Sequence, residues 1–359
     1  MPKTRMPVGP SELTSEWLSN AMDAPVRSFS TQVIGEGVGL LGQLARISLE
    51  YEDAPGSAPR SLIAKFPAAV QENRDLANLF QFYEREVRFY EQIAGRAQIA
   101  TPRCFFAAFD AASGTFVLLI EDLSDARIGD QCVGATQEEA ELAVREMAKL
   151  HADWWGKVDT DELDWIPYAN APVHRSAEDS YQKSLGPCLN IFGHCVPDSV
   201  RPVMEKLATN VCYLLDRASE PPCTIVHGDF RYDNLFFADE PGQRMFTVID
   251  WQIMSRARGP YDLGYFLSQS VQTAARRARE KDLLAQYHQT LLDNGVKHYS
   301  PEDCFDDYRR SVLYCLVYPV IADGTLDLSN ERGVSLVSAM LERSLIAIDD
   351  LNCGELLPG

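Results

Sequence analysis

Three polar residues near the middle of the chain have the types and the spacing that phosphoryl transfer needs. Asp229 closes a His-Gly-Asp triplet after a short β-branched run, and Asn234 follows five residues later. Asp250 stands at the end of a second apolar run. In kinases one Asp accepts the proton of the substrate hydroxyl, while an Asn and another Asp hold magnesium on the ATP phosphates. We therefore predict Asp229 as the base, and Asn234 and Asp250 as the metal ligands.

The segment between these residues predicts a β-hairpin that places all three side chains at one rim. The apolar run 235–237 and the run 245–249 are its strands, and Pro241-Gly242 is its turn. Magnesium takes oxygen ligands and keeps several waters, so one carboxylate and one amide oxygen are sufficient protein ligands. The alternative is an ordinary hairpin with two aspartates on its surface.

A glycine-rich loop lies near the start of the chain, after the alternating strand 29–34. The segment 37–42 fits G-x-G-x-x-G, a pattern found in both dehydrogenases and kinases. A dinucleotide-binding fold needs a helix after the glycines, but residues 45–51 alternate between apolar and polar side chains, which indicates a strand. A glycine turn between two strands is the kinase arrangement. We therefore predict that Gly35, Gly37 and Gly39 bind the nucleotide.

A lysine and a glutamate follow in the order that a kinase requires. Lys65 lies inside the apolar strand 61–66, and we predict that it binds the nucleotide phosphates. The next segment, 76–93, has the periodicity of a helix. We choose Glu86 as the partner of Lys65, because Glu84 falls about 200° away around the helix.

Further elements are predicted from the same patterns. A second hairpin, 104–109 with 115–120, leads into Glu121, Asp122 and Leu123. A capping box predicts a helix over 136–155. The remaining helices are expected at 283–294, 301–317 and 334–351.

Together these motifs resemble the aminoglycoside phosphotransferase and choline kinase superfamily. The local sequence around the motifs is similar to the ecdysteroid-kinase-like group of that superfamily. The similar stretches are GEGVGLLGQLARISLEY, FYEREVRFY, VLLIEDL and KLHADWWG. The resemblance implies an α+β bilobal fold with a β-rich N-lobe over 1–120, a hinge over 121–124 and a mostly helical C-lobe over 125–359. It also implies that the adenine pairs with the backbone of Glu121, Asp122 and Leu123, where the Asp122 side chain is as much a solvent-facing residue as a functional one. The aromatic segment 154–192 is then expected to supply core and part of the acceptor pocket.

The resemblance also assigns structural roles. Asp262 is expected to bond backbone near the catalytic loop, and His151 to end a helix. Two departures from protein kinases point away from protein phosphorylation: Gly228 replaces an arginine, and Trp251-Gln252 replaces Phe-Gly.

The predicted function is therefore ATP- and magnesium-dependent transfer of phosphate to the hydroxyl of a small molecule, with an apolar or steroid-like alcohol as one acceptor class. Two alternatives stay open: a catalytically silent nucleotide-binding module, and a kinase of aminoglycosides or amino alcohols. Fold and catalytic residues do not determine which acceptor is used.

Bulk composition excludes several other classes. The 359 residues carry a net charge of −19, which argues against nucleic acid as a partner. Most of this charge, −15, lies after Ser124, where it either attracts a cationic substrate or simply solvates the surface. The nine cysteines form no C-x-x-C pair, and neither a signal peptide nor a membrane span is recognisable. We expect a cytoplasmic protein without an obligate protein partner.

Overall fold

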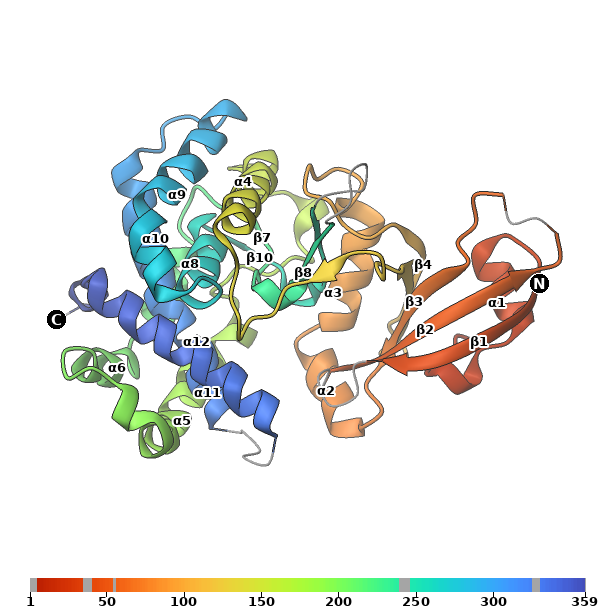
Figure 1. Ribbon diagram of the computed structural model, residues 1–359, viewed down its shortest axis with the longest axis horizontal. Helices are drawn as coiled ribbons and strands as arrows, with labels where there is room; N and C mark the ends of the chain where they lie inside the picture. The colour runs from red at the N-terminus through yellow and green to blue at the C-terminus, as the bar shows by residue number, and fades with distance from the viewer. Residues whose placement is uncertain (1–4, 35–40, 54–55, 239–245, 325–329, 359) are drawn as a thin grey trace. The chain divides into compact units, whose positions relative to one another are not determined.

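The computed structural model describes residues 5–34, 41–53, 56–238, 246–324 and 330–358 (Figure 1). Its contacts group the chain into two compact units. The first unit comprises Met1–Ala126 and Thr247–Ile253, and the second comprises Arg127–Phe246 and Met254–Gly359. The predicted lobe and hinge boundaries remain predictions, but the short segment Thr247–Ile253, which they place in the C-lobe, packs with the first unit.

The first unit is built on a five-stranded sheet. Its strands lie in the order β1-β2-β3-β5-β4, and every neighbouring pair is antiparallel. The strands are β1 (Val26–Ile34), β2 (Gly42–Tyr51), β3 (Ser61–Pro67), β4 (Cys104–Asp110) and β5 (Thr115–Glu121). All five were predicted from alternating or apolar runs, because a strand with one buried face repeats every two residues.

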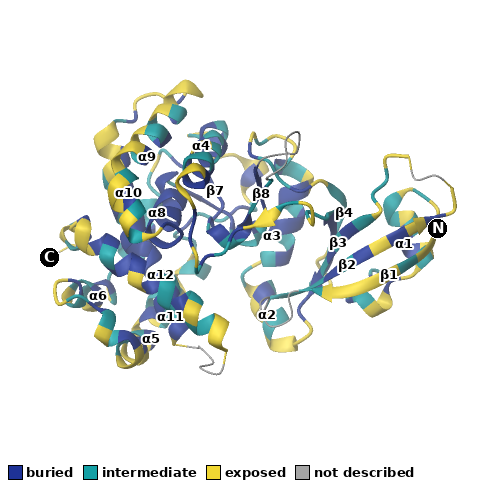
Figure 2. Ribbon diagram, viewed as in Figure 1, coloured by how far each residue is buried: buried dark blue, intermediate teal, exposed yellow. Residues whose placement is uncertain are grey.

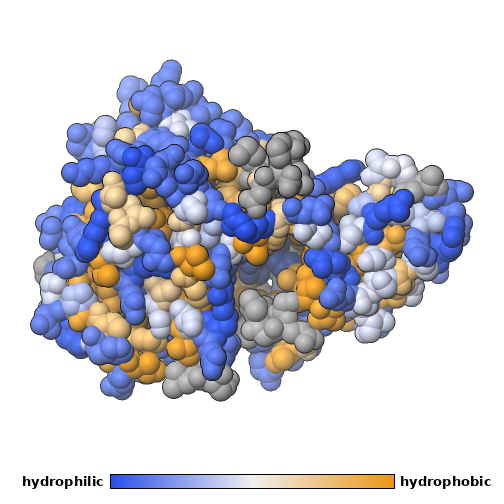
Figure 3. All heavy atoms as spheres, viewed as in Figure 1, coloured by the Kyte–Doolittle hydropathy of each residue, from blue (hydrophilic) through white to orange (hydrophobic). Residues whose placement is uncertain are grey.

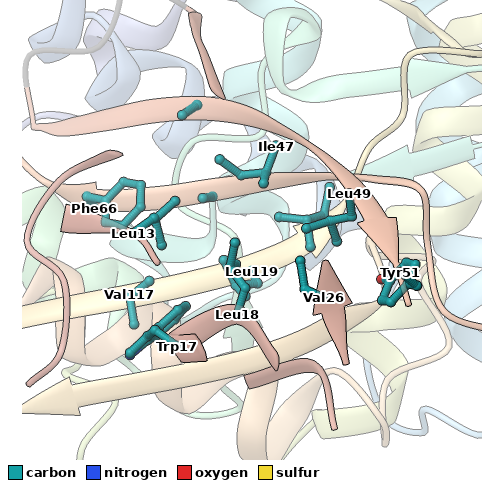
Figure 4. Close-up of a cluster of buried hydrophobic side chains, with 13 residues drawn as sticks. Leu13, Trp17, Leu18, Val26, Ile47, Leu49, Tyr51, Phe66, Val117 and Leu119 are labelled. Atoms are coloured by element: carbon teal, nitrogen blue, oxygen red, sulfur yellow. The ribbon is translucent and has the colours of Figure 1, made fainter. Parts of the chain in front are cut away.

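One apolar cluster joins this sheet to the first helix, α1 (Ser15–Met22). Thr14 caps α1 by accepting a hydrogen bond from the backbone N–H of Trp17. Trp17 and Leu18 then pack against β2 and β5 side chains such as Ile47 and Leu119 (Figure 4). These side chains are almost fully buried, so hydrophobic burial positions the strand that carries Lys65.

The predicted helix over 76–93 is wrong as a single element. The structure has α2 (Gln71–Leu79), α3 (Phe82–Arg88) and a π-helical turn, Phe89–Ile93. Gln81 adopts a left-handed conformation with φ 57°, which interrupts the helix. The buried guanidinium of Arg85 donates to the carbonyl of Phe80, a group that the break removes from the helical ladder.

The second unit is mostly helical. Its described helices are α4 (Gln137–Trp154), α5 (Ser176–Phe192), α6 (Arg201–Leu207), α7 (Val211–Ala218), α8 (Pro260–Gln269), α9 (Thr273–Asp293), α10 (Pro301–Cys315), α11 (Val317–Asp323) and α12 (Glu331–Asp350). Its short strands are β6 (Arg127–Ile128), β7 (Thr224–Val226), β8 (Leu235–Phe237) and β10 (Ser255–Ala257), and β9 (Phe246–Val248) begins in this unit. The predicted α+β class, with a β-rich first part and a helical second part, is confirmed. The predicted turn at Pro241-Gly242 lies outside the described residues.

Helix α8 forms the centre of the second unit, and all ten of its residues are buried (Figure 2). It packs closely on α10, because a Cβ on Gly264 would lie only 2.5 Å from that of Ser311. The predicted helix 301–317 ends early for a related reason. Pro319 has no N–H for the Cys315 carbonyl, and the side chain of Gln269 donates to that carbonyl instead.

The capping box at the start of α4 is present as predicted: Thr136 accepts from the backbone of Glu139, whose side chain accepts in return. Hydrophilic side chains gather over the end of the unit that carries α9 (Figure 3). Among the described residues, no helix is both long enough and apolar enough to cross a membrane.

Candidate active site

Lys65 of β3 lies between two carboxylates of the first unit. Its ammonium donates to Glu86 at 2.8 Å and to Asp250 Oδ1 at 2.8 Å. Burial alone would lower the pKa of Lys65, but the charges of Asp250 and Glu86 outweigh burial and raise it. The lysine is therefore held as a cation at the place where we predicted a phosphate-binding group.

Glu86 of α3 is the buried member of this group, with only 2 % of its side chain exposed. Glu84, the rejected alternative, pairs with Arg88 on the more exposed side of the same helix. The choice between the two carboxylates thus follows from the helix geometry used in the sequence analysis.

Asp250 stands on a strained piece of backbone. Its φ is 68°, a left-handed value that a non-glycine residue rarely adopts and that is often kept for function. The next residue fixes this conformation: the ring of Trp251 stacks on Phe89 with centroids 4.0 Å apart and is fully buried. Trp251 also donates from its indole to the carbonyl of Val248. Asp250 is consequently held toward Lys65 by packing as well as by charge.

The residues predicted to bind the adenine have side chains engaged within the first unit. The Asp122 carboxylate accepts from the guanidinium of Arg46 and from the hydroxyl of Ser61. The Glu121 carboxylate accepts from the backbone N–H of Arg103. The solvent-facing reading of Asp122 is therefore wrong, because its side chain is only 5 % exposed. Nucleotide binding by the backbone of this stretch remains a prediction.

The glycine-rich loop cannot be described in the same way. Gly35, Gly37 and Gly39 lie outside the described residues. Their predicted contact with phosphates stays a prediction from the sequence.

In the second unit, Asp229 belongs to a loop that leaves β7 and is anchored by one buried carboxylate. Asp262 of α8 accepts from the backbone N–H groups of His227 at 2.7 Å and Gly228 at 2.9 Å. Gly228 has a φ of 86°, a conformation that favours glycine and explains this residue in the triplet. The predicted structural role of Asp262 is confirmed.

His151 of α4 completes the anchor. Its two ring nitrogens lie 3.1 Å from an oxygen of Asp262 and 2.8 Å from the hydroxyl of Tyr287, and the ring is fully buried. A histidine enclosed in this way orients a neighbour, so the structural interpretation of His151 agrees with its contacts.

Asn234 turns its amide back onto Asp229. Its Nδ2 donates to the backbone carbonyl of Asp229 and to Oδ2 of the same residue, both at 2.9 Å. The amide nitrogen is thereby committed to Asp229, and the oxygen is the atom that it can offer to a metal. The Asp229 carboxylate remains 19 % exposed.

Two residues around Asp229 were missed by the sequence analysis. The guanidinium of Arg231 lies 3.3 Å from Asp229 Oδ2, and the buried phenol of Tyr265 is close enough to feel the charge of the same carboxylate. Burial and the charge of Asp229 raise the pKa of Tyr265 well above its usual value, so the phenol stays a donor. Arg231 could have been found from the sequence, because it lies two residues after Asp229. Tyr265 is distant in the sequence and is brought close by the packing of α8.

Each of the two predicted metal ligands is, taken singly, of a type that magnesium accepts. Asn234 offers an amide oxygen, and Asp250 a carboxylate whose side chain is 24 % exposed, so a ligand can reach it. Carboxylate and amide oxygens are the ligands that this hard cation prefers. The metal-binding role of both residues remains a prediction.

The arrangement belongs to a known fold. A candidate aminoglycoside phosphotransferase from Ralstonia eutropha has a TM-score of 0.56 at 15 % identity, covering 96 % of this chain and 98 % of its own. Choline kinase from Cryptosporidium parvum has a TM-score of 0.54 at 11 % identity, with coverages of 95 % and 92 %. A GDP complex of a mutant aminoglycoside 2'-phosphotransferase-IIIa has a TM-score of 0.55 at 12 % identity, with coverages of 94 % and 100 %. These likenesses establish a kinase-like phosphotransferase fold.

The sequence itself decides the family. The model of the ecdysteroid kinase-like family matches residues 36–298, and the chain belongs to that family. Comparison with curated proteins gives no match. The resemblance expected from the motifs is confirmed.

Proposed function

We propose that this chain is a small-molecule kinase that transfers the γ-phosphoryl group of ATP to the hydroxyl of a small alcohol. The observation that carries the proposal is the Lys65 ammonium held by Glu86 and Asp250, each at 2.8 Å. A buried lysine with two acidic partners suits nucleotide phosphates, because these can take the place of a carboxylate on the same cation. Family membership supports the same reaction class.

In the proposed reaction the acceptor oxygen forms a bond to the γ-phosphorus. The bond from that phosphorus to the β–γ bridging oxygen breaks, and its electron pair leaves with ADP. The acceptor proton passes to the carboxylate of Asp229, which the amide of Asn234 holds in place. The main work of Asp229 is to orient the acceptor hydroxyl, because the proton leaves late in a loose transition state.

Asn234 and Asp250 would hold magnesium in this reaction. When bound, the metal would supply positive charge that offsets the negative charge developing on the phosphates. Glu86 orients Lys65 toward the α- and β-phosphates, and the backbone of Glu121, Asp122 and Leu123 binds the base. The loop with Gly35, Gly37 and Gly39 covers the phosphates. These assignments follow the family resemblance together with the contacts described above.

The proposal for the acceptor is less specific than the proposal for the reaction. The family description points to steroid alcohols, and the choline and aminoglycoside kinases among the structural neighbours point to amino alcohols. We propose a small hydroxylated molecule as acceptor, with apolar or steroid-like alcohols tested first.

A screen for ADP release tests the proposal. Wild-type protein, magnesium and ATP or GTP are combined with a panel of steroid, amino and sugar alcohols, and product is verified by mass spectrometry. We expect ADP release that depends on one acceptor class and is abolished in Asp229→Asn. A protein that binds magnesium–ATP but phosphorylates nothing across the panel would be a nucleotide-binding module, and the enzyme proposal would fail.

A further inference from the structure

Arg231 is fixed inside the Asp229 loop with its guanidinium between two carboxylates. Nε lies 3.3 Å from Asp229 Oδ2, and Nη1 lies 3.2 Å from Asp233 Oδ2. The backbone around it is equally fixed, since Arg231 donates to the carbonyl of Asp229 and accepts from the N–H of Asn234. The side chain is 23 % exposed, so solvent and ligands can reach it.

Neither carboxylate needs Arg231 as an anchor. Asp233 accepts from the backbone N–H of Gln131 at 2.8 Å, and its other partner is Arg332 at 3.8 Å. Asp229 is held by the amide of Asn234, which donates to both its backbone carbonyl and its carboxylate. A purely structural arginine would duplicate contacts that already exist, which favours an electrostatic role.

The proposed reaction creates a need for positive charge at this place. The transferred group carries negative charge and must approach the Asp229 carboxylate, so two like charges meet. Among the described residues, Arg231 is the basic side chain that forms an ion pair with Asp229. The other cation of the machinery, Lys65, already shares its charge between Glu86 and Asp250.

Arginine is also better suited than lysine to bind phosphoryl oxygens at this place. A guanidinium has five N–H donors in a planar fork, so it can keep its carboxylates while it donates to phosphoryl oxygens. The ammonium of lysine has three donors and is more strongly hydrated. Arginines placed in this way stabilise the charge of phosphoryl transition states in other enzymes.

We propose that Arg231 is a catalytic residue of phosphoryl transfer, which donates to the γ-phosphoryl oxygens while they pass from ADP to the acceptor. This inference rests on the proposed function. Arg231 takes part in no bond change: the oxygen–phosphorus bonds form and break as described above, and the proton still goes to Asp229. Arg231 offsets the negative charge that gathers between that carboxylate and the transferred group.

The test uses magnesium–ADP with fluoroaluminate, a flat anionic analogue of the transferred group, so no acceptor has to be known. Calorimetry gives the Kd of magnesium–ADP with and without fluoroaluminate for wild type, Arg231→Met and Arg231→Lys. Arg332→Met is the matched control, because Arg332 also contacts Asp233 but has no contact with Asp229 among the described ion pairs.

We expect fluoroaluminate to tighten ADP binding to wild type and to Arg332→Met. Arg231→Met should lose this tightening by roughly 10²-fold, the effect of removing one donor to a developing anion. Its affinity for magnesium–ADP alone should stay within about twofold of wild type, because ground-state binding does not use the residue. In Arg231→Ala, guanidinium ion added at low millimolar concentration should restore part of the tightening, which a folding defect would not allow.

Equal tightening in wild type and Arg231→Met, including none in either, overturns the inference and leaves the proposed function standing. A wild-type protein that does not bind magnesium–ADP overturns both. If fluoroaluminate tightens ADP binding to Arg231→Lys as much as to wild type, a positive charge alone is sufficient. That result would overturn the claim that the planar guanidinium group is needed.

Discussion

The two units hold their proposed active-site residues in opposite ways. In the first unit, Lys65, Glu86 and Asp250 are held by one another through side-chain ion pairs. In the second unit, the Asp229 loop is held through backbone N–H groups that donate to the buried carboxylate of Asp262. The first unit therefore holds its residues by attraction between charged side chains, and the second unit holds its loop by hydrogen bonds that fix the backbone.

This difference predicts different responses to ligands and to mutation. Ion pairs can exchange partners, so under the proposed function Lys65 would release a carboxylate when it binds phosphates. Backbone contacts to a buried carboxylate cannot exchange without loss of structure, because the donors would be left unpaired. Substitutions should therefore alter binding in the first unit, and either stability or turnover in the second.

The largest expected effect tests the anchor of the second unit. Asp262→Ala leaves the N–H groups of His227 and Gly228 and the ring of His151 without their partner. We expect a loss of roughly 3–5 kcal/mol in the free energy of unfolding, measured by urea denaturation. Asp216→Asn, at the half-exposed pair with Arg175, should change it by less than about 0.5 kcal/mol. A loss below about 1 kcal/mol in Asp262→Ala would mean that the loop does not depend on this anchor.

The next largest effect is expected on turnover, when the charge of Asp229 is removed but its shape is kept. Asp229→Asn keeps the shape and removes the acceptor for the substrate proton, so turnover should fall by roughly 10²-fold or more. Magnesium–ATP affinity should stay near wild type in calorimetry, because Asp229 is not among the residues proposed to bind the nucleotide or the metal. Near-normal turnover with an identified acceptor would remove Asp229 from the mechanism.

Much of this organisation could be predicted from the sequence, because its signals are local. The capping box at Thr136 and the alternation in β2 depend on neighbouring residues, and both were read correctly. The choice of Glu86 over Glu84 needed only helix periodicity. The motifs, taken in order, also identified the family.

What could not be predicted depends on distant contacts. The bond from Lys65 to Asp250 joins residues 185 positions apart, and the partners of Asp122 lie on other strands. The break at Gln81 has no glycine or proline to announce it, and its stabilising partner, Arg85, gives no signal until the chain is packed. The sequence could name the charged residues but not the pairs that they form.

A smaller effect is expected when one charge of the first unit is removed. Asp250→Asn should weaken magnesium–ATP binding by at least about tenfold, because the proposed metal site would lose its charged ligand. ATP binding in the presence of a chelator should instead stay unchanged or improve, since a carboxylate near the phosphates is gone. Calorimetry with and without magnesium measures both, and Glu84→Gln is the control on the exposed side of α3. An equal loss in both conditions would show that Asp250 is not a metal ligand.

The smallest expected effect concerns Asp122 and acid. Burial tends to raise its pKa, but the bonds from Ser61 and Arg46 outweigh burial and lower it. The folded pKa therefore lies below the unfolded value, so the stabilisation is complete above about pH 4 and disappears as the pH falls through the folded pKa. Asp122→Asn should narrow the difference in unfolding free energy between pH 7 and pH 3. Identical pH profiles for variant and wild type would assign the acid sensitivity to other groups.

The first unit is built from two segments that are far apart in the sequence, and this has a consequence for protein synthesis. The unit lacks Thr247–Ile253 until about 120 further residues have been added, which takes roughly 6 to 24 s at common translation rates. During that interval Phe89 is without the indole that covers it, and Lys65 is without one of its two carboxylates. A nascent chain in this state presents an aromatic surface to chaperones and to neighbouring chains. A fragment that stops at Ala126 would present that surface permanently, so recombinant versions of the first unit need the later segment joined to them.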